Sequence, residues 1–148
     1  MDKSISKINK RLDDIEKNVQ KMLLSVGNAA KNEIGLAFEQ EKSPFGAKWA
    51  ELSDATKKRK KSPLKLYEKG DLRSRWTLTK RTNEVIITNS AKANGFAYGL
   101  THQYGSNRAG RGRKVKIPAR PFLPIADDRL SDSLKKIIKK SYKEIFGE

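Results

Sequence analysis

The first 40 residues carry an apolar side chain at every third or fourth position, and this spacing constrains the fold more than any other feature. The positions are Ile5, Ile8, Leu12, Ile15, Val19, Met22 and Val26. They predict a helix with Ser4 as its N-cap, and a less strict pattern continues the helix to Gln40. An unbroken helix of that length would be about 55 Å long, whereas a compact domain of 148 residues is only about 40 Å across. The helix must therefore protrude or bend, and Gly27 and Gly35 are the expected positions of a bend.

The apolar face of this helix has two possible neighbours. A spacing near 3.5 residues is typical of a coiled coil with another chain, but the flanking positions, Arg11 and Glu16 among them, show poor charge complementarity. For the second half of the helix we therefore favour packing against the chain's own sheet. The first half stays open between the two arrangements. Its apolar residues are our candidates for contact with another subunit: Ile5, Ile8, Leu12 and Ile15.

The remaining sequence predicts short elements. Pro44 and Gly46 indicate a loop, and Ser53 the N-cap of a short helix. Pro63 indicates a helical turn that stops at Gly70 and is followed by another short helix or turn. Residues 75–90 predict a β-hairpin that turns at 80–83. Residues 96–105 fit a short helix or a strand, and 114–125 an extended, proline-rich segment. A C-terminal amphipathic helix is expected to start near Asp127 and Asp128 and to reach Ile145.

These elements predict an α+β fold in a single domain, 1–148. A small antiparallel sheet would pack with a long N-terminal helix, 1–40, and with the C-terminal helix. The body, 41–148, would carry a long basic loop at about 105–117.

Composition narrows the classes of function. The chain has no cysteine and one histidine, which excludes disulfides and cysteine-based zinc sites. No apolar run approaches the roughly 20 residues that cross a membrane, and the N-terminus lacks an apolar signal core, so we expect a soluble, intracellular protein. The net charge of +16 favours an acidic partner: nucleic acid, an acidic membrane or an acidic protein.

Most of the unusual charge density lies in one glycine-rich stretch. Its cations are Arg108, Arg111, Arg113, Lys114 and Lys116. The glycines resemble the start of a phosphate-binding P-loop, but Arg111 and Gly112 stand where that motif needs Lys and Ser or Thr. We expect either a solvated, mobile loop or a nonspecific contact to phosphate or to an acidic surface.

No catalytic or metal site is expected. His102 has few acidic residues near it in sequence, so a framework role is favoured over a catalytic one. Asp127 and Asp128 have no second acidic cluster and fit a helix start better than a metal site. We therefore predict no enzyme activity, no metal and no cofactor.

Four segments, taken together and in order, resemble the tailed-bacteriophage virion morphogenesis family, which includes the Mu-like G protein and tail completion proteins. The resemblance runs from about Phe38 to Ile145. The pair "HQYG" and "IPARPFL" at this separation is its most specific part. The four segments are "SPFGAKWAELSDATKKRK", "LYEKGDLRSRW", "FAYGLTHQYG" and "IPARPFLPI".

The resemblance implies a structural role in joining phage heads to tails. It implies a homo-oligomeric ring, most simply sixfold, at the head–tail joint, with assembly in the host cytoplasm and no membrane association. The partners would be other neck, connector or tail proteins, and DNA in the connector lumen is a further candidate. The alternative, suggested by charge alone, is a nonspecific nucleic-acid-binding protein that uses its basic loop and helix faces.

The segments that carry the resemblance also suggest framework positions. We expect Arg120, held between two prolines, to pair with a carboxylate or to cap a helix C-terminus, and Gly105 to permit a backbone turn. The full set of expected framework residues is Trp49, Gly70, Leu72, His102, Gly105, Pro118, Arg120, Pro121 and Phe122.

Overall fold

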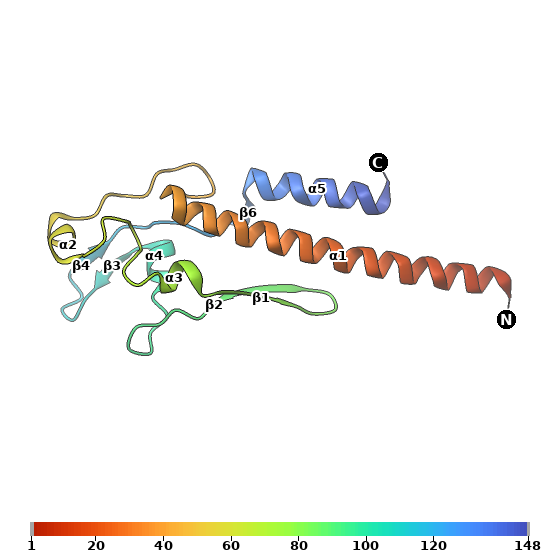
Figure 1. The fold of residues 1–148 in the computed structure, drawn as a ribbon, viewed down its shortest axis with the longest axis horizontal. Coiled ribbons are helices and arrows are strands. Elements are labelled where there is room, and N and C mark those ends of the chain that lie inside the picture. The colour runs from red at the N-terminus through yellow and green to blue at the C-terminus, as the bar shows by residue number, and fades with distance from the viewer. Residues whose placement is uncertain (1, 148) are drawn as a thin grey trace.

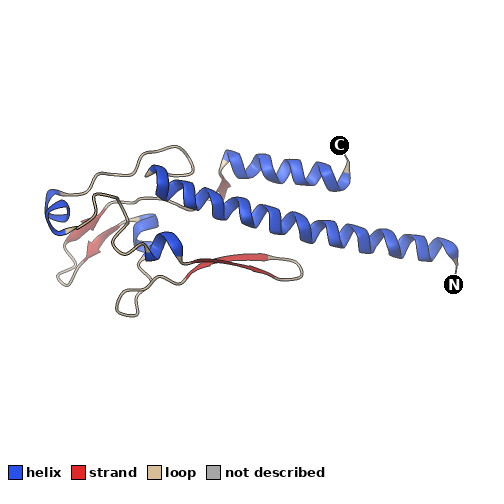
Figure 2. Cartoon of the chain, viewed as in Figure 1, coloured by secondary structure: helices blue, strands red, loops and turns tan. Residues whose placement is uncertain are grey.

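The computed structural model describes residues 2–147 and has an elongated shape built around one long helix (Figure 1). The other helices are short except the last, and the strands form three separate two-stranded antiparallel sheets (Figure 2). The helices are α1 (Lys3–Gln40), α2 (Asp54–Arg59), α3 (Asp71–Ser74), α4 (Gly99–Tyr104) and α5 (Asp132–Phe146). The strands are β1 (Trp76–Lys80), β2 (Val85–Asn89), β3 (Ser106–Ala109), β4 (Val115–Ile117), β5 (Ile125–Ala126) and β6 (Arg129–Leu130).

Helix α1 is continuous over 38 residues, and its N-terminal turns extend beyond the rest of the chain (Figure 1). The predicted N-cap is wrong by two positions, because the carboxylate of Asp2 accepts the hydrogen bond from the Ser4 backbone N–H at 3.1 Å. The helix is not interrupted at either glycine. Gly27 instead lets the β1–β2 hairpin approach closely, since a Cβ there would lie 2.5 Å from Val85 Cγ1.

The core lies around the C-terminal half of α1. Ile34 is only 1% exposed and belongs to a buried cluster that includes Phe38, Trp49 and Phe122. The Phe38 ring meets Trp49 edge-on with centroids 5.4 Å apart and lies 5.2 Å from the Phe122 ring. The second half of the apolar face of α1 therefore packs against the chain's own body, partly against the β1–β2 sheet, as predicted, and partly against Trp49 and Phe122, which lie outside the strands.

The predicted hairpin at residues 75–90 is confirmed as β1–β2, with Trp76 opposite Asn89 and Lys80 opposite Val85. Asn89 also fixes the hairpin to α3, because its side-chain amide donates to the Leu72 carbonyl at 2.9 Å. The hairpin lies alongside α1 (Figure 1).

Helix α5 packs against α1 on the side away from that hairpin (Figure 1). Its N-cap is Ser131, whose hydroxyl accepts from the Leu134 N–H at 3.2 Å and donates to Glu33 of α1 at 2.6 Å. The prediction that Asp127 and Asp128 start the helix is wrong. Both have positive φ angles in the tight turn between β5 and β6.

The α+β class with a long first helix and a C-terminal helix is confirmed. Three local expectations differ from the structure: the strands do not form one sheet, residues 61–70 after Pro63 contain turns instead of a helical turn, and the expected basic loop is largely a hairpin, β3–β4. That hairpin forms because Val115 and Ile117 continue an extended chain opposite Ala109 and Ser106, while the glycine-rich residues between the strands make the turn.

Candidate functional site

The N-terminal half of α1 has a solvent-exposed apolar stripe. Residues 2–17 are all exposed, and none of them touches the core. The stripe consists of Ile5, Ile8, Leu12 and Ile15, with exposed fractions of 51%, 58%, 59% and 36%. Further along the same face Val19 and Met22 are half-buried, and from Gly27 onward the face enters the core. Four large aliphatic side chains on one helical face are thus left in water by the described part of the chain.

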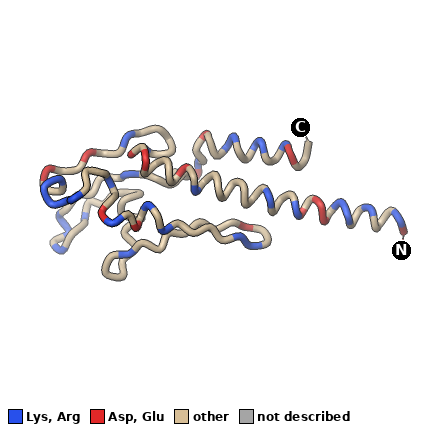
Figure 3. Tube along the Cα trace, viewed as in Figure 1, with Lys and Arg blue, Asp and Glu red and all other residues tan. Residues whose placement is uncertain are grey.

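The β3–β4 hairpin carries the basic stretch at the opposite end of the molecule from the N-terminus (Figures 1 and 3). Its five cations are exposed, and none of them forms an ion pair with a described residue. They are Arg108, Arg111, Arg113, Lys114 and Lys116. The hairpin starts at Gly105, which has φ +74° and lies so close to the Ile117 carbonyl that a Cβ would sit 2.8 Å from it.

The proline-rich segment after the hairpin is fastened by polar contacts. The Trp49 indole donates to the Pro121 carbonyl at 2.7 Å. The buried amide oxygen of Gln103 accepts from the N–H groups of Phe122 and Leu123 at 2.9 and 3.1 Å. These bonds join α4 and the loop around Trp49 to the same extended segment, so they fix the base of the basic hairpin to the body.

Arg120 lies within this arrangement and is 5% exposed. Its guanidinium donates to the carbonyls of Ala50 and Glu51, both at 2.9 Å, and its backbone N–H donates to the His102 carbonyl at 2.7 Å. The sequence suggested a carboxylate or a helix C-terminus as its partner. The structure gives it two loop carbonyls instead.

His102, whose carbonyl accepts from the Arg120 N–H, lies with Arg120 in the lining of a groove. Its Nδ1 is buried and has no hydrogen-bond partner among the described residues, and its ring meets Tyr98 edge-on at 6.0 Å. Burial lowers the pKa of His102, and the positive charges of Arg120 and Lys60 lower it further. Among the described residues no side chain hydrogen-bonds this imidazole, and its neighbours in the pKa shift are cations.

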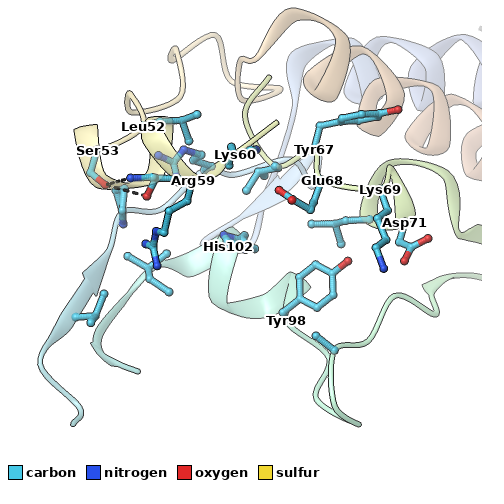
Figure 4. Close-up of a pocket in the computed structure, with 18 of the residues that line it drawn as sticks. Leu52, Ser53, Arg59, Lys60, Tyr67, Glu68, Lys69, Asp71, Tyr98 and His102 are labelled. Carbon is cyan, nitrogen blue, oxygen red and sulfur yellow. Dashed lines mark hydrogen bonds between the residues drawn. The ribbon is translucent and has the colours of Figure 1, made fainter. Parts of the chain in front are cut away.

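The groove itself has a volume of about 1040 Å³ and opens between α2, the segment before α3, α4 and β4 (Figure 4). Figure 4 shows Arg59 and Lys60 on the α2 side, Lys69 and Asp71 on the α3 side, and His102 below. Apolar side chains line much of it, among them Leu52, Leu66 and Ile117. No local pattern in the sequence predicts this groove, because its walls come from five separate stretches of chain.

The predicted framework residues fall into two groups. Trp49, Leu72, Arg120 and Phe122 are buried, whereas Gly70, His102, Gly105, Pro118 and Pro121 are half-buried at turns, at the groove wall or beside the core. Two further residues with tertiary roles, Gln103 and Ser131, were not singled out in the sequence. Gln103 lies inside the "HQYG" segment, so its position in that motif was the one available signal.

Within residues 2–147 no group of three or more His, Asp or Glu side chains is placed to hold a metal ion. None of the described helices combines the length and the apolar character that crossing a membrane requires.

Comparison with known proteins identifies the family of this chain. Residues 1–141 match the model of the phage virion morphogenesis family. A Mu-like prophage FluMu G protein 2 from Haemophilus influenzae is 31% identical over 116 residues, which cover 78% of this chain and 73% of that protein. No solved structure matches. The chain therefore belongs to the phage virion morphogenesis family and has a structural role in phage morphogenesis.

Proposed function

We propose that this protein is a structural subunit of the head–tail joint, where copies of the chain assemble into a ring and complete the neck or tail. Six copies are the simplest expectation. The ring acts by binding other neck, connector or tail proteins, not by catalysis.

The observation that carries the proposal is the exposed apolar stripe on the protruding half of α1. Fully burying a Leu or Ile side chain stabilises a contact by about 1.5–3 kcal/mol. The four side chains of the stripe are already about half-covered by their own helix, so burying the remainder would contribute roughly 3–6 kcal/mol per helix. A protein that works as a monomer gains nothing from leaving such a stripe in water, whereas a ring subunit needs one surface of this kind for each neighbour.

The basic hairpin supports a second contact of the same assembly. Its cations project from a framework that is fixed at its base by the Trp49 and Gln103 hydrogen bonds. Such a hairpin suits an acidic face of a neighbouring protein, or the DNA that passes through a connector lumen.

The test replaces the stripe without altering the helix. Ile5, Ile8, Leu12 and Ile15 are all changed to Gln, a residue with good helix propensity. Because these side chains are exposed in the single chain, the variant should keep its helical circular-dichroism signal and a cooperative thermal transition, lower only by the stability that assembly adds to the parent. The mass of the assembly, measured by light scattering, should fall to that of the monomer, and the variant should fail to restore infectious particles.

The matched control changes four lysines elsewhere on the same half of the helix to Gln. It should assemble and complement as the parent does. If the stripe variant assembles and complements normally, the proposal is wrong. If it unfolds, the stripe stabilises the monomer and is not an assembly surface. The control positions are Lys3, Lys7, Lys10 and Lys17.

A further inference from the structure

The groove beside α2 combines an apolar floor with a basic rim (Figure 4). Five of the cations that line it are not paired with any described carboxylate. Two of the three carboxylates in the lining are already engaged, because Glu51 pairs with Lys65 at 3.0 Å and Asp71 with Arg75 at 3.1 Å. The groove therefore suits an apolar segment that carries negative charge. The five unpaired cations are Arg59, Lys60, Lys69, Lys92 and Lys116.

One segment of this chain has that chemistry and is itself exposed. Residues 12–16, Leu-Asp-Asp-Ile-Glu, lie in the protruding half of α1 and hold three carboxylates in five positions. Figure 3 shows this acidic patch between basic stretches of the helix. Within it the side chains of Leu12 and Ile15 are 59% and 36% exposed.

The helix also places these charges on a suitable side of the stripe. Glu16 follows Leu12 by four residues and flanks the apolar stripe on one side, whereas Asp13 lies further round on that side, next to Lys17. Arg11, four residues before Ile15, flanks the stripe on its other side. Most lysines of this half fall on the opposite face, with the third carboxylate, Asp14, among them. A helix laid with its stripe into the groove would therefore bring Glu16 to the basic rim, with Asp13 at the edge of the contact, and would leave the lysines in solvent. The lysines on the outer face are Lys3, Lys7, Lys10, Lys17 and Lys21.

The 12–16 segment of α1 and the elements that form the groove, α2, α4 and β4, lie at opposite ends of the molecule (Figure 1), so the continuous helix α1 cannot reach the groove of its own chain. We propose that the 12–16 segment of α1 docks into the α2-side groove of a second copy. The contact is head-to-tail, and repeating it around a closed rotation builds a ring. This inference rests on the proposed ring function and assigns both surfaces of its subunit contact.

The absence of cysteine makes the contact directly testable by cross-linking. In the full chain, Asn9→Cys places a thiol beside the stripe and Ala55→Cys places one on the exposed α2 edge of the groove. A mixture of the two single variants, treated with a short bifunctional maleimide, should give a covalent dimer. The double variant should give a ladder of dimer, trimer and larger species, while each single variant alone should stay monomeric.

Charge reversal provides a second measurement. Asp13→Lys with Glu16→Lys should weaken the cross-link by about tenfold or more, because like charges would then face each other. Arg59→Glu with Lys116→Glu should do the same. Combining all four substitutions in one chain should restore the cross-link, a rescue that a merely structural role of these exposed residues does not predict.

Three results would overturn the inference. A dimer from Asn9→Cys alone would show that two stripes pair with each other. The mixture could give no cross-link although the parent still forms an oligomer that the stripe variant loses. The stripe would then contact a surface other than the groove, and the proposed ring would stand. Cross-linking of Ala55→Cys in particles to a different virion protein, and not to a second copy, would assign the groove to that protein. Failure of the ring proposal has a separate signature, since the parent itself would then be monomeric and absent from particles.

Discussion

Ser131→Ala tests whether one buried hydroxyl both caps α5 and holds it against α1. Ser131 is fully buried, and its Oγ accepts from the Leu134 N–H at 3.2 Å and donates to Glu33 Oε2 at 2.6 Å. Loss of an N-cap costs about 1 kcal/mol, and loss of a hydrogen bond to a charged group costs about 1.5–3 kcal/mol. The other oxygen of Glu33, Oε1, is already buried without a hydrogen-bond partner among the described residues. Removing the Ser131 hydroxyl therefore leaves the second carboxylate oxygen, Oε2, without its donor as well.

We expect the free energy of unfolding to fall by about 2–4 kcal/mol in Ser131→Ala. The matched control is Ser53→Ala, which removes an exposed cap that accepts from the Thr56 N–H at 3.3 Å and should cost only about 0.5–1 kcal/mol. Both values come from urea denaturation followed by circular dichroism, at one protein concentration so that assembly contributes equally. Equal losses in the two variants would refute the reasoning, because the tie to Glu33 would then contribute nothing.

The remaining predictions concern a glycine, the histidine and the basic hairpin. Gly35→Ala should stabilise the helix by about 0.5–1 kcal/mol. Gly27→Ala should be less stable than Gly35→Ala by about 1–3 kcal/mol, because the new Cβ meets the β1–β2 hairpin. Equal free energies of unfolding for the two variants in urea would contradict this. Since burial and two nearby positive charges lower the pKa of His102, the unfolded chain binds this proton first, so stability should fall as the pH drops below about 6.5. His102→Gln should flatten that part of the stability curve, and an unchanged curve would remove His102 as the cause. Changing the five hairpin cations to Ser should alter stability by about 1 kcal/mol or less, and if they contact DNA, the logarithmic salt slope of binding should shrink by up to about 0.9 per lost phosphate contact. Equal salt slopes for parent and variant would remove DNA as the partner of the hairpin. The five changes are Arg108, Arg111, Arg113, Lys114 and Lys116 to Ser.

The sequence predicted the elements whose signal is local. The spacing of apolar residues gave α1 and the burial of its second half, because a helix repeats every 3.6 residues whatever surrounds it. β-Branched alternation gave β1–β2 in the same way. The protruding N-terminal half followed from length alone, since a helix ending at Gln40 is longer than a body of this size.

The errors arose where two segments compete for the same role. Asp127 and Asp128 resemble helix-start residues, but the β5–β6 turn needs positive φ angles, which Asp tolerates, and Ser131 caps the helix. The glycine-rich basic stretch looked like a loop because its strands are only four and three residues long. At the start of β3 the backbone of Gly105 lies too close to the Ile117 carbonyl to leave room for a side chain. This contact joins residues 12 positions apart, so no local pattern in the sequence reveals it.

The surfaces were predictable to different degrees. The stripe from Ile5 to Ile15 was visible in the sequence, because residues spaced by three and four share a helical face. The groove was not, because α2, α4 and β4 are brought together by tertiary contacts, among them the Arg120 bonds to Ala50, Glu51 and His102. The partner residues of Ser131 and Gln103 were hidden for the same reason, since they lie 98 and 19 positions away.

The most direct test of the proposed role is a cryo-electron microscopy reconstruction of the head–tail joint in particles that contain this protein. We expect a closed ring of copies of this chain at the joint, with each α1 extending from its own body to the neighbouring copy. Particles in which the joint lacks this chain, or in which isolated copies are bound without contact between them, would contradict it.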